Sequence, residues 1–182
     1  MVIFTKGTKQ FNRIKWVLTA ICKDKARLNL CVIHVDTESI VTTDGKRVHR
    51  IDRAVNDIDI EPGDYKVLSN TAHQVLLEPS TDGLRYPDYH MVIPRDREMK
   101  PLGCYGRRRA NKRPDHLRAA GYALTEMLRK SEPFAIDINF LADALQNQAD
   151  TDFDKYSVKD GASPILLESP LGLQAVIMPV RL

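Results

Sequence analysis

The chain has few cysteines and no long apolar run. Its 182 residues include three cysteines, Cys22, Cys31 and Cys104, which are far apart and never form a C-x-x-C pair. An odd number of scattered cysteines indicates neither a disulfide framework nor a zinc site. No stretch approaches the ~18 apolar residues of a membrane span, and the opening MVIFTKGTKQF is too short and polar for a signal peptide. We therefore expect a soluble, cytoplasmic protein.

The sequence also lacks the usual signatures of catalysis. It contains no G-x-G-x-x-G, no G-x-x-x-x-G-K-[ST] and no G-x-S-x-G. The five histidines do not have metal-ligand spacing. The carboxylates of HVDTE (34–38) and NDIDIE (56–61) lie beside turn or strand signals and are expected to face solvent rather than a metal. We predict that the protein is not an enzyme and needs no metal or cofactor.

The chain does have the amino-acid composition of a folded protein, and its charges are unevenly distributed along the sequence. Hydrophobic residues make up 43% and charged residues 28%, which is typical of one globular domain or two small ones. The net charge is +3, but Arg95 to Arg113 holds eight basic residues against two acids, and Ser131 to Leu182 holds three against eight. The basicity is therefore local, which argues against a uniformly basic nucleic-acid surface.

Apolar periodicity and turn residues predict the elements of the first half. Thr8 is a suitable N-cap for a helix whose apolar residues recur at helical spacing. Asp44-Gly45 and Pro62-Gly63 mark turns. The expected order is a helix over 8–25, strands over 28–35, 39–44, 46–51 and 64–69, and a short helical stretch over 71–78.

The second half repeats this order without a clear residue-level repeat. It is expected to hold a helix over 116–130, a strand over 134–138, a helix over 139–148, and strands over 152–160, 163–169 and 172–182. The prediction is an α+β fold of two β-α-β-β-β units with antiparallel sheets and helices on one face. The units are 1–94 and 115–182, joined by a basic linker or loop over 95–114, and they pack either as two halves or as one domain.

Four segments resemble one family in the right order. TTDGKRV (42–48), RYPDYHMVIP (85–94), FAIDINFLADAL (134–145) and SPILLES…AVIMPVRL (163–182) are similar to motifs of bacterial DNA polymerase III beta subunits, the sliding clamps. The resemblance implies a DNA-clamp-like fold. It covers about two thirds of this chain, as a shortened middle domain joined to the back half of a last domain. No equivalent of the first clamp domain is found, so closure of a ring is left open.

In that family, the segments retained here converge on a hydrophobic pocket for short linear peptides of polymerases, loaders and repair factors. Methionine adapts to different apolar ligands, and arginine binds carbonyl or acidic groups. The alternative is a hairpin turn and a final strand packed only for stability. The resemblance implies a pocket formed by Thr43, Gly45, Lys46, Arg47, Val48, Pro87, Met91, Val92, Pro164, Val176, Met178, Pro179, Val180, Arg181 and Leu182.

DNA binding is expected from basic residues in two places. GRRRANKRP (106–114) neutralises phosphates without aromatic residues for base stacking, which favours non-specific backbone binding over base reading. The alternative is a solvated loop with no partner. Helices of a clamp ring face DNA, so helix 8–25 is the other candidate. The predicted DNA-binding residues are Arg13, Lys15, Lys23, Arg107, Arg108, Arg109, Lys112 and Arg113.

The resulting prediction is a sliding-clamp-like protein that binds peptides of replication or repair proteins and also double-stranded DNA without sequence preference. A homo-oligomer would be needed to encircle a duplex. Two alternatives remain: an adaptor or decoy that forms no ring and competes with a host clamp for its partners, and a basic DNA-binding accessory protein. No membrane partner is expected.

Overall fold

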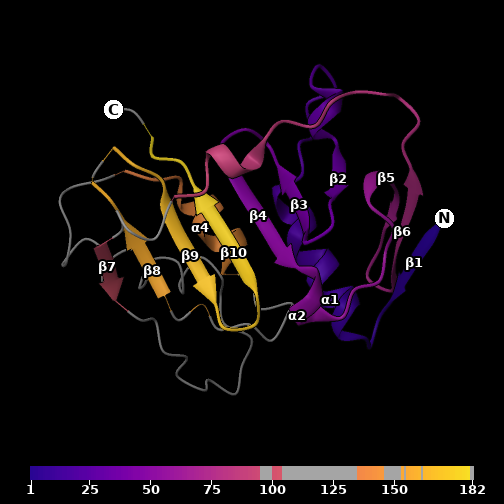
Figure 1. Ribbon diagram of the computed structural model, residues 1–182, viewed down its shortest axis with the longest axis horizontal. Coiled ribbons are helices and arrows are strands. Elements are labelled where there is room, and N and C mark those ends of the chain that lie inside the picture. Colours follow the sequence, from indigo (N-terminus) through magenta and orange to yellow (C-terminus); the bar gives the residue numbers. More distant parts are fainter. Residues whose placement is uncertain (95–99, 104–134, 146–152, 154, 161, 181–182) are drawn as a thin grey trace.

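The computed structural model describes residues 1–94, 100–103, 135–145, 153, 155–160 and 162–180 (Figure 1). The first half contains β1 (Val2–Thr5), α1 (Lys9–Val17), η1 (Leu18–Ala20), η2 (Leu28–Leu30), β2 (Val32–Val35), β3 (Ser39–Thr43), β4 (Arg47–Asp52), α2 (Arg53–Asn56), β5 (Gly63–Asn70), β6 (Gln74–Pro79) and η3 (Tyr89–Met91). The second contains β7 (Lys100–Gly103), α4 (Ile138–Ala144), β8 (Lys155–Val158), β9 (Ile165–Ser169) and β10 (Leu173–Ile177). None of the helices in these ranges is long and apolar enough to cross a membrane.

The strands form one ten-stranded sheet in the order β1-β6-β5-β2-β3-β4-β10-β9-β8-β7. Every adjacent pair is antiparallel. The two halves of the chain meet where β4 pairs with β10, with Val48 opposite Val176. Figure 1 shows these two strands side by side at the centre of the molecule. Backbone hydrogen bonds therefore join the halves into a continuous sheet.

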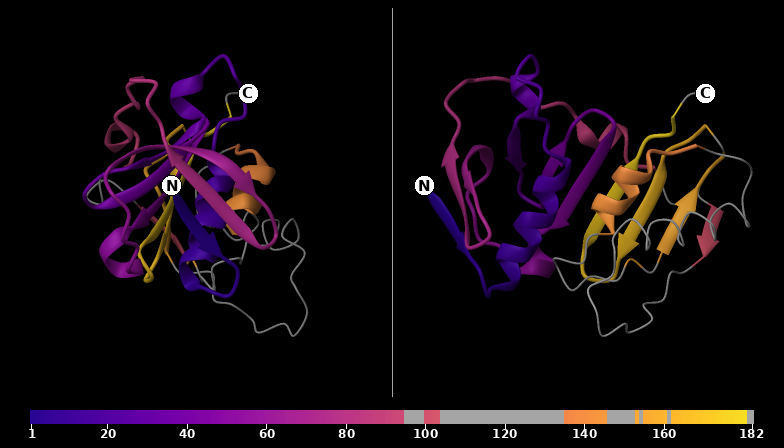
Figure 2. Two further views of the ribbon diagram at one scale, coloured as in Figure 1. Left: turned by 90° about the vertical axis from the view of Figure 1, so that its right-hand side faces the viewer. Right: turned by 180° about the vertical axis from the view of Figure 1, so that it is seen from behind.

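Both longer helices cover the same face of this sheet, as the view from behind in Figure 2 shows. Their buried residues share one core cluster with residues of β3, β4, β9 and β10. Trp16 of α1 is fully buried, and its indole Nε1 donates to the carbonyl of Ala144 at the end of α4 at 2.9 Å. Its ring also stacks on His49 of β4 at 4.4 Å between centroids. The predicted α+β fold with antiparallel strands and helices on one face is confirmed.

Helix α1 begins as predicted but ends earlier. The Thr8 hydroxyl accepts a hydrogen bond from the backbone N–H of Phe11 at 3.1 Å, which is an N-cap. The apolar residues Phe11, Ile14 and Val17 are buried on the sheet. The chain then tightens into η1 and becomes extended at Ile21, so the predicted helix over 8–25 is too long. Ile21 is partly buried and packs against the edge of the core, but it is not part of the helix.

The short helix predicted over 71–78 is wrong, because these residues lead into and form strand β6. Val75 and Leu77 are fully buried, whereas Gln74 and Glu78 are exposed, so the segment has the period of a strand. β6 lies between β1 and β5 and pairs with both. The contiguous Val-Leu-Leu run hid this alternation in the sequence.

The second half differs from expectation at two further points. Residues 135–137 have no regular structure and α4 begins at Ile138, where the sequence predicted a strand over 134–138 and a helix from 139. Asp137 caps α4 by accepting a hydrogen bond from the N–H of Asn139 at 2.8 Å. This cap starts the helix at Ile138, inside the segment that was predicted to be a strand. Residues 100–103 form β7 inside the predicted linker or loop. The predicted helix over 116–130 lies outside the described residues.

Candidate functional site

A groove of about 330 Å³ opens on the sheet face opposite α1 and α4. On β4, His49 and Ile51 face the helices, so Val48 between them faces the groove. Three segments supply most of the walls: the β3–β4 turn, the linker at 87–92 and the end of β10. The lining residues are Arg27, Asn29, Leu30, Thr43, Gly45, Arg47, Val48, Pro87, Asp88, Tyr89, Val92, Val176 and Met178.

The β3–β4 turn is shaped by local hydrogen bonds. Asp44 Oδ1 accepts from the N–H of Lys46 at 2.9 Å and from that of Arg47 at 3.2 Å. Gly45 has a φ of +85°, which favours glycine, and a β-carbon there would lie 3.0 Å from Arg27 Nη1. Arg27 Nη1 in turn donates to the carbonyl of Asp44 at 2.8 Å. The turn and the loop that carries Arg27 thus form one rim of the groove.

The linker wall is held on the sheet by aromatic and polar contacts. Tyr86 stacks on His34 of β2 with 4.5 Å between centroids, and His34 Nδ1 lies 2.7 Å from a carboxylate oxygen of Asp64. The Tyr89 hydroxyl donates to the Asp36 carboxylate. Burial, and then this bond to Asp36, raise the pKa of Tyr89 to about 12, so the hydroxyl stays a donor at neutral pH.

The end of β10 forms the third wall. Because Val176 pairs with Val48 across the β4–β10 ladder, their side chains lie next to each other on the groove face. After β10 ends, the N–H of Met178 donates to the carbonyl of Lys46 at 2.9 Å and brings Met178 to the turn. Segments from the two halves of the chain therefore meet around one groove.

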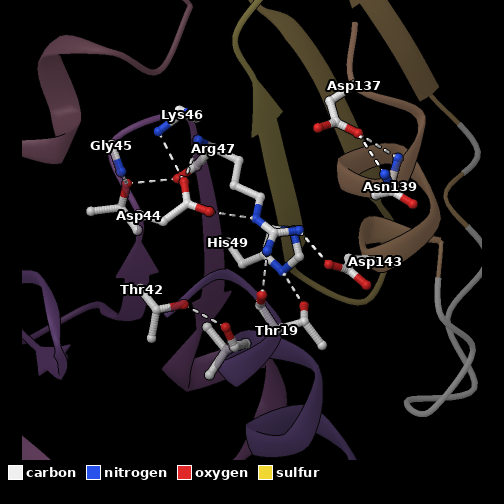
Figure 3. Close-up of polar contacts among 12 residues, drawn as sticks. Thr19, Thr42, Asp44, Gly45, Lys46, Arg47, His49, Asp137, Asn139 and Asp143 are labelled. Atoms are coloured by element: carbon white, nitrogen blue, oxygen red, sulfur yellow. Dashed lines mark hydrogen bonds and ion pairs between the residues drawn. The ribbon is translucent and has the colours of Figure 1, made fainter. Parts of the chain in front are cut away.

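Arg47 belongs to the lining, but its guanidinium faces the helices (Figure 3). Its Nε donates to Asp44 at 3.1 Å, one Nη donates to Asp143 of α4 at 2.5 Å and the other to the carbonyl of Thr19 at 2.6 Å. The same group lies 4.5 Å from the centre of the Phe140 ring, and the residue is only 8% exposed. The guanidinium that the sequence analysis offered to a peptide is thus already held by partners within the protein.

Eight residues of the predicted peptide set line the groove: Thr43, Gly45, Arg47, Val48, Pro87, Val92, Val176 and Met178. Five others do not: Lys46, Met91, Pro164, Pro179 and Val180. Met91 is 82% exposed, and the N–H of Val180 bonds to the carbonyl of Ala135. Arg181 and Leu182 lie outside the described residues.

Five lining residues were missed by the sequence analysis. Asp88 and Tyr89 belong to the RYPDYHMVIP segment, so that motif contained the signal. Arg27, Asn29 and Leu30 come from a loop that has no comparable motif. Only the tertiary fold brings that loop beside the Asp-Gly turn.

The structure separates the predicted DNA-binding residues. Arg13 is 6% exposed, so it does not present its charge to a DNA backbone, and this prediction is wrong. Lys15 is partly exposed and donates to Asn70 and to the carbonyl of Thr71, whereas Lys23 is exposed. Arg107, Arg108, Arg109, Lys112 and Arg113 lie outside the described residues.

The groove is mostly apolar. The described residues that line it include no cysteine, serine, histidine or lysine, and Asp88 is the sole carboxylate among them. Across the described part of the chain, no group of three or more metal-ligating side chains comes together. What the groove offers a ligand is apolar surface from valine, leucine, proline and methionine, with polar groups at its rim.

The sequence matches no protein-family model and no curated protein. The structure is similar to that of the Caulobacter crescentus beta sliding clamp, with 18% identity, a TM-score of 0.57, and coverage of 100% of this chain and 65% of that one. The chain has the sliding-clamp fold. The resemblance seen in the sequence motifs is thereby confirmed for the fold.

Two further solved sliding clamps carry bound ligands. The Bartonella birtlesii clamp, bound to griselimycin, has 18% identity and a TM-score of 0.57, and the match covers 99% of this chain and 66% of that one. The Helicobacter pylori clamp, bound to a DNA ligase peptide, has 13% identity and a TM-score of 0.56, with the same coverage. The chain thus spans 65–66% of the length of these sliding clamps.

Proposed function

We propose that the chain is a clamp-like protein that binds short linear peptides of replication or repair proteins in the groove. One observation carries the proposal: residues of the turn, the linker and the final strand, chosen from the sequence as a peptide pocket, line one cavity. Val48, Val92 and Val176 give it an apolar wall, and Met178 adapts to ligands of different shape. This pattern suits a peptide anchored by apolar side chains.

The size and rim of the groove fit such an anchor. A volume of about 330 Å³ is at the lower end of the roughly 300–1,000 Å³ of small-molecule sites. That room suits one or two side chains and not a folded domain. Asn29, Asp88 and Arg27 at the rim offer hydrogen bonds to the peptide backbone or to a polar neighbour of the anchor.

The test uses a fluorescently labelled DNA ligase peptide of the kind bound to the H. pylori clamp, titrated with the intact chain. Met178→Asp places a charge in the apolar groove and is expected to weaken peptide binding at least about tenfold. Met91→Asp is the matched control, because it makes the same change on the exposed side of the linker. Its affinity should stay within about twofold of the parent.

The melting temperatures of both variants show whether a loss is local. Met178 is only partly buried and follows the end of β10, so its replacement is expected to leave the fold in place. Equal loss of affinity in the two variants, or no binding by the parent chain to any clamp-binding peptide, contradicts the proposed function. The fold assignment is independent of that result.

Non-specific DNA binding is the second part of the proposal, and the basic sequence GRRRANKRP supports it. Replacing Arg107, Arg108, Arg109, Lys112 and Arg113 with serine should abolish binding to a labelled duplex. In the parent, a plot of the logarithm of the binding constant against the logarithm of the salt concentration should have a slope of about −0.9 for each phosphate contacted. Unchanged binding in the variant would remove this segment from the interface.

Ring formation distinguishes the clamp-like function from the adaptor or decoy. A chain spanning 65% of a sliding clamp needs further copies or partners to surround a duplex. Sedimentation of the protein with and without a duplex measures this directly. A self-associated form that stays on circular DNA and leaves linear DNA supports a ring, whereas a strict monomer with intact peptide binding supports the adaptor.

A further inference from the structure

Two cysteines lie together at the base of the loop that forms one rim of the groove. Cys22 follows η1 and is 4% exposed, and Cys31 precedes β2 and is partly buried. The N–H of Cys22 donates to the carbonyl of Leu30 at 3.3 Å, so the backbone on either side of the loop is already paired. Neither cysteine takes part in a disulfide.

The two thiols share one hydrogen-bond acceptor. The Sγ of Cys22 lies 3.9 Å from the carbonyl oxygen of Asp24, and the Sγ of Cys31 lies 3.3 Å from the same oxygen. The Cys31 Sγ is also 3.4 Å from the carbonyl oxygen of Arg27. Because both sulfur atoms contact the same carbonyl oxygen, the two thiols are neighbours in space.

The loop closed by this pair is part of the groove. Arg27, Asn29 and Leu30, which lie between the two cysteines, line it, and Arg27 also bonds to the carbonyl of Asp44 in the turn. Apart from its backbone bonds, the loop has one ion pair of its own, between Arg27 and Asp24 at 3.3 Å on the surface. A covalent link at its base would therefore restrict a wall that is otherwise held by a few polar contacts.

We propose that Cys22 and Cys31 form a reversible disulfide that fixes the loop 22–31 against the groove. Glutathione disulfide serves as the oxidant. The Cys31 thiolate attacks one of its sulfurs, the S–S bond breaks, and one glutathione leaves as a thiolate that takes up a proton. The deprotonated Cys22 thiol then attacks the Cys31 sulfur and releases the second glutathione. Two protein thiols are oxidised, and one glutathione disulfide is reduced to two thiols.

The reaction has a pH signature. Burial, followed by the neighbouring Cys22 thiol, raises the pKa of Cys31, so its reactive thiolate is scarce at neutral pH. Oxidation is expected to become faster as the pH rises toward 9. An exposed cysteine with its ordinary pKa would gain less over the same interval.

The first experiment detects the bond in the intact chain carrying Cys104→Ser, which removes the third thiol. After treatment with glutathione disulfide, trypsin cuts after Lys23, Lys25 and Arg27, so the Cys22 and Cys31 peptides separate unless they are linked. The linked pair should appear in the mass spectrum and disappear with dithiothreitol. The double variant Cys104→Ser/Cys31→Ala should give no linked pair. Recovery of only glutathione adducts, or of unmodified peptides, overturns the proposal.

The second experiment measures the consequence for the groove, and this part rests on the proposed peptide binding. Closing a loop of this length should raise the melting temperature by about 5 °C. It should also tighten binding of the DNA ligase peptide at least about threefold, because the wall is preorganised. A linked protein with unchanged affinity refutes control of the groove. If no peptide binds in either redox state, the proposed function fails while the mass spectrum still decides whether the disulfide forms.

Discussion

Within the described residues, the two faces of the sheet are covered to very different degrees. On one face α1 and α4 bury a large core in which Trp16, Ile51 and Leu167 are fully inaccessible. On the other face the described residues that cover the small cluster around Val48 and Val176 belong mainly to the linker, and the groove lies beside it. The helix face therefore provides most of the stability. The linker face has a smaller apolar cluster among the described residues, and the groove lies beside it.

Polar groups follow the same division. On the helix face, Arg47 and His49 are buried and are held by partners from α1, η1 and α4. On the linker face, His34 and Tyr89 are held by carboxylates on the sheet, and Tyr89 also lines the groove. Replacing the first pair should change stability with little effect on binding, and replacing the second should change binding as well as stability. Three predictions test this separation.

The largest effect is expected from the protonation of His49. Burial, and then the charge of Arg47, lower its pKa from 6.5 to about 3, so the folded protein keeps it neutral. Below pH 6.5 the unfolded chain takes up a proton that the folded chain does not, and stability is lost progressively as the pH falls toward 3. Between pH 7 and 4.5 this residue should cost on the order of 2–3 kcal/mol of unfolding free energy, measured by urea denaturation.

His49→Phe is the matched control, because phenylalanine keeps a ring against Trp16 and cannot take up a proton. The variant should lose this component of the pH dependence, while the carboxylates still titrate as in the parent. A parent and a variant with the same dependence on pH would show that His49 is protonated in the folded protein.

The second prediction concerns Arg47. Arg47→Met removes the cation between Asp44 and Asp143 and should lower the unfolding free energy by about 2 kcal/mol, reduced from the 3–5 of a fully buried pair because Asp143 is partly exposed. Peptide affinity should change less than about threefold, since the guanidinium faces the helices. Lys46→Met, at the exposed neighbour, should alter stability by less than about 0.5 kcal/mol. If Arg47→Met loses most of its peptide affinity but keeps normal stability, the guanidinium binds the peptide and the prediction is wrong.

The smallest effect is expected at Tyr89. Tyr89→Phe removes the hydroxyl that bonds to Asp36 and should cost about 1 kcal/mol of stability. Because Tyr89 also lines the groove, peptide affinity should fall by about two- to fivefold as the linker loosens. A double-mutant cycle with Asp36→Ala, which removes the acceptor, isolates this contact when both melting and peptide titration are measured. Additive effects in the cycle would mean that the bond does not hold the linker.

Local chemistry made part of this structure predictable. The Thr8 cap and the Asp44-Gly45 turn are fixed by neighbouring residues, so their sequences were sufficient. The groove walls at Val48, Val92 and Val176 were found through motif resemblance, because those motifs describe segments that meet only in the fold. The direction of Arg47 was missed because it depends on strand parity and on an acidic partner in α4.

The remaining errors also arise from tertiary contacts. Residues 74–79 became a strand because β1 and β5 offer them ladders on both sides. Arg13 was assigned to a DNA-facing surface because the helices of a clamp ring face DNA, whereas this residue lies among the buried residues of α1. The loop residues Arg27 and Leu30 have no motif, and only their approach to the turn makes them part of the groove.

The pairing of β4 with β10 also sets the order in which this sheet can be completed. The two strands come from opposite halves of the chain, so β4 is synthesised well before its partner. Until β10 is made, one edge of β4 is unpaired and the wall formed by Val176 and Met178 is missing. A chain that stops before β10 therefore exposes a strand edge, which invites aggregation and proteolysis.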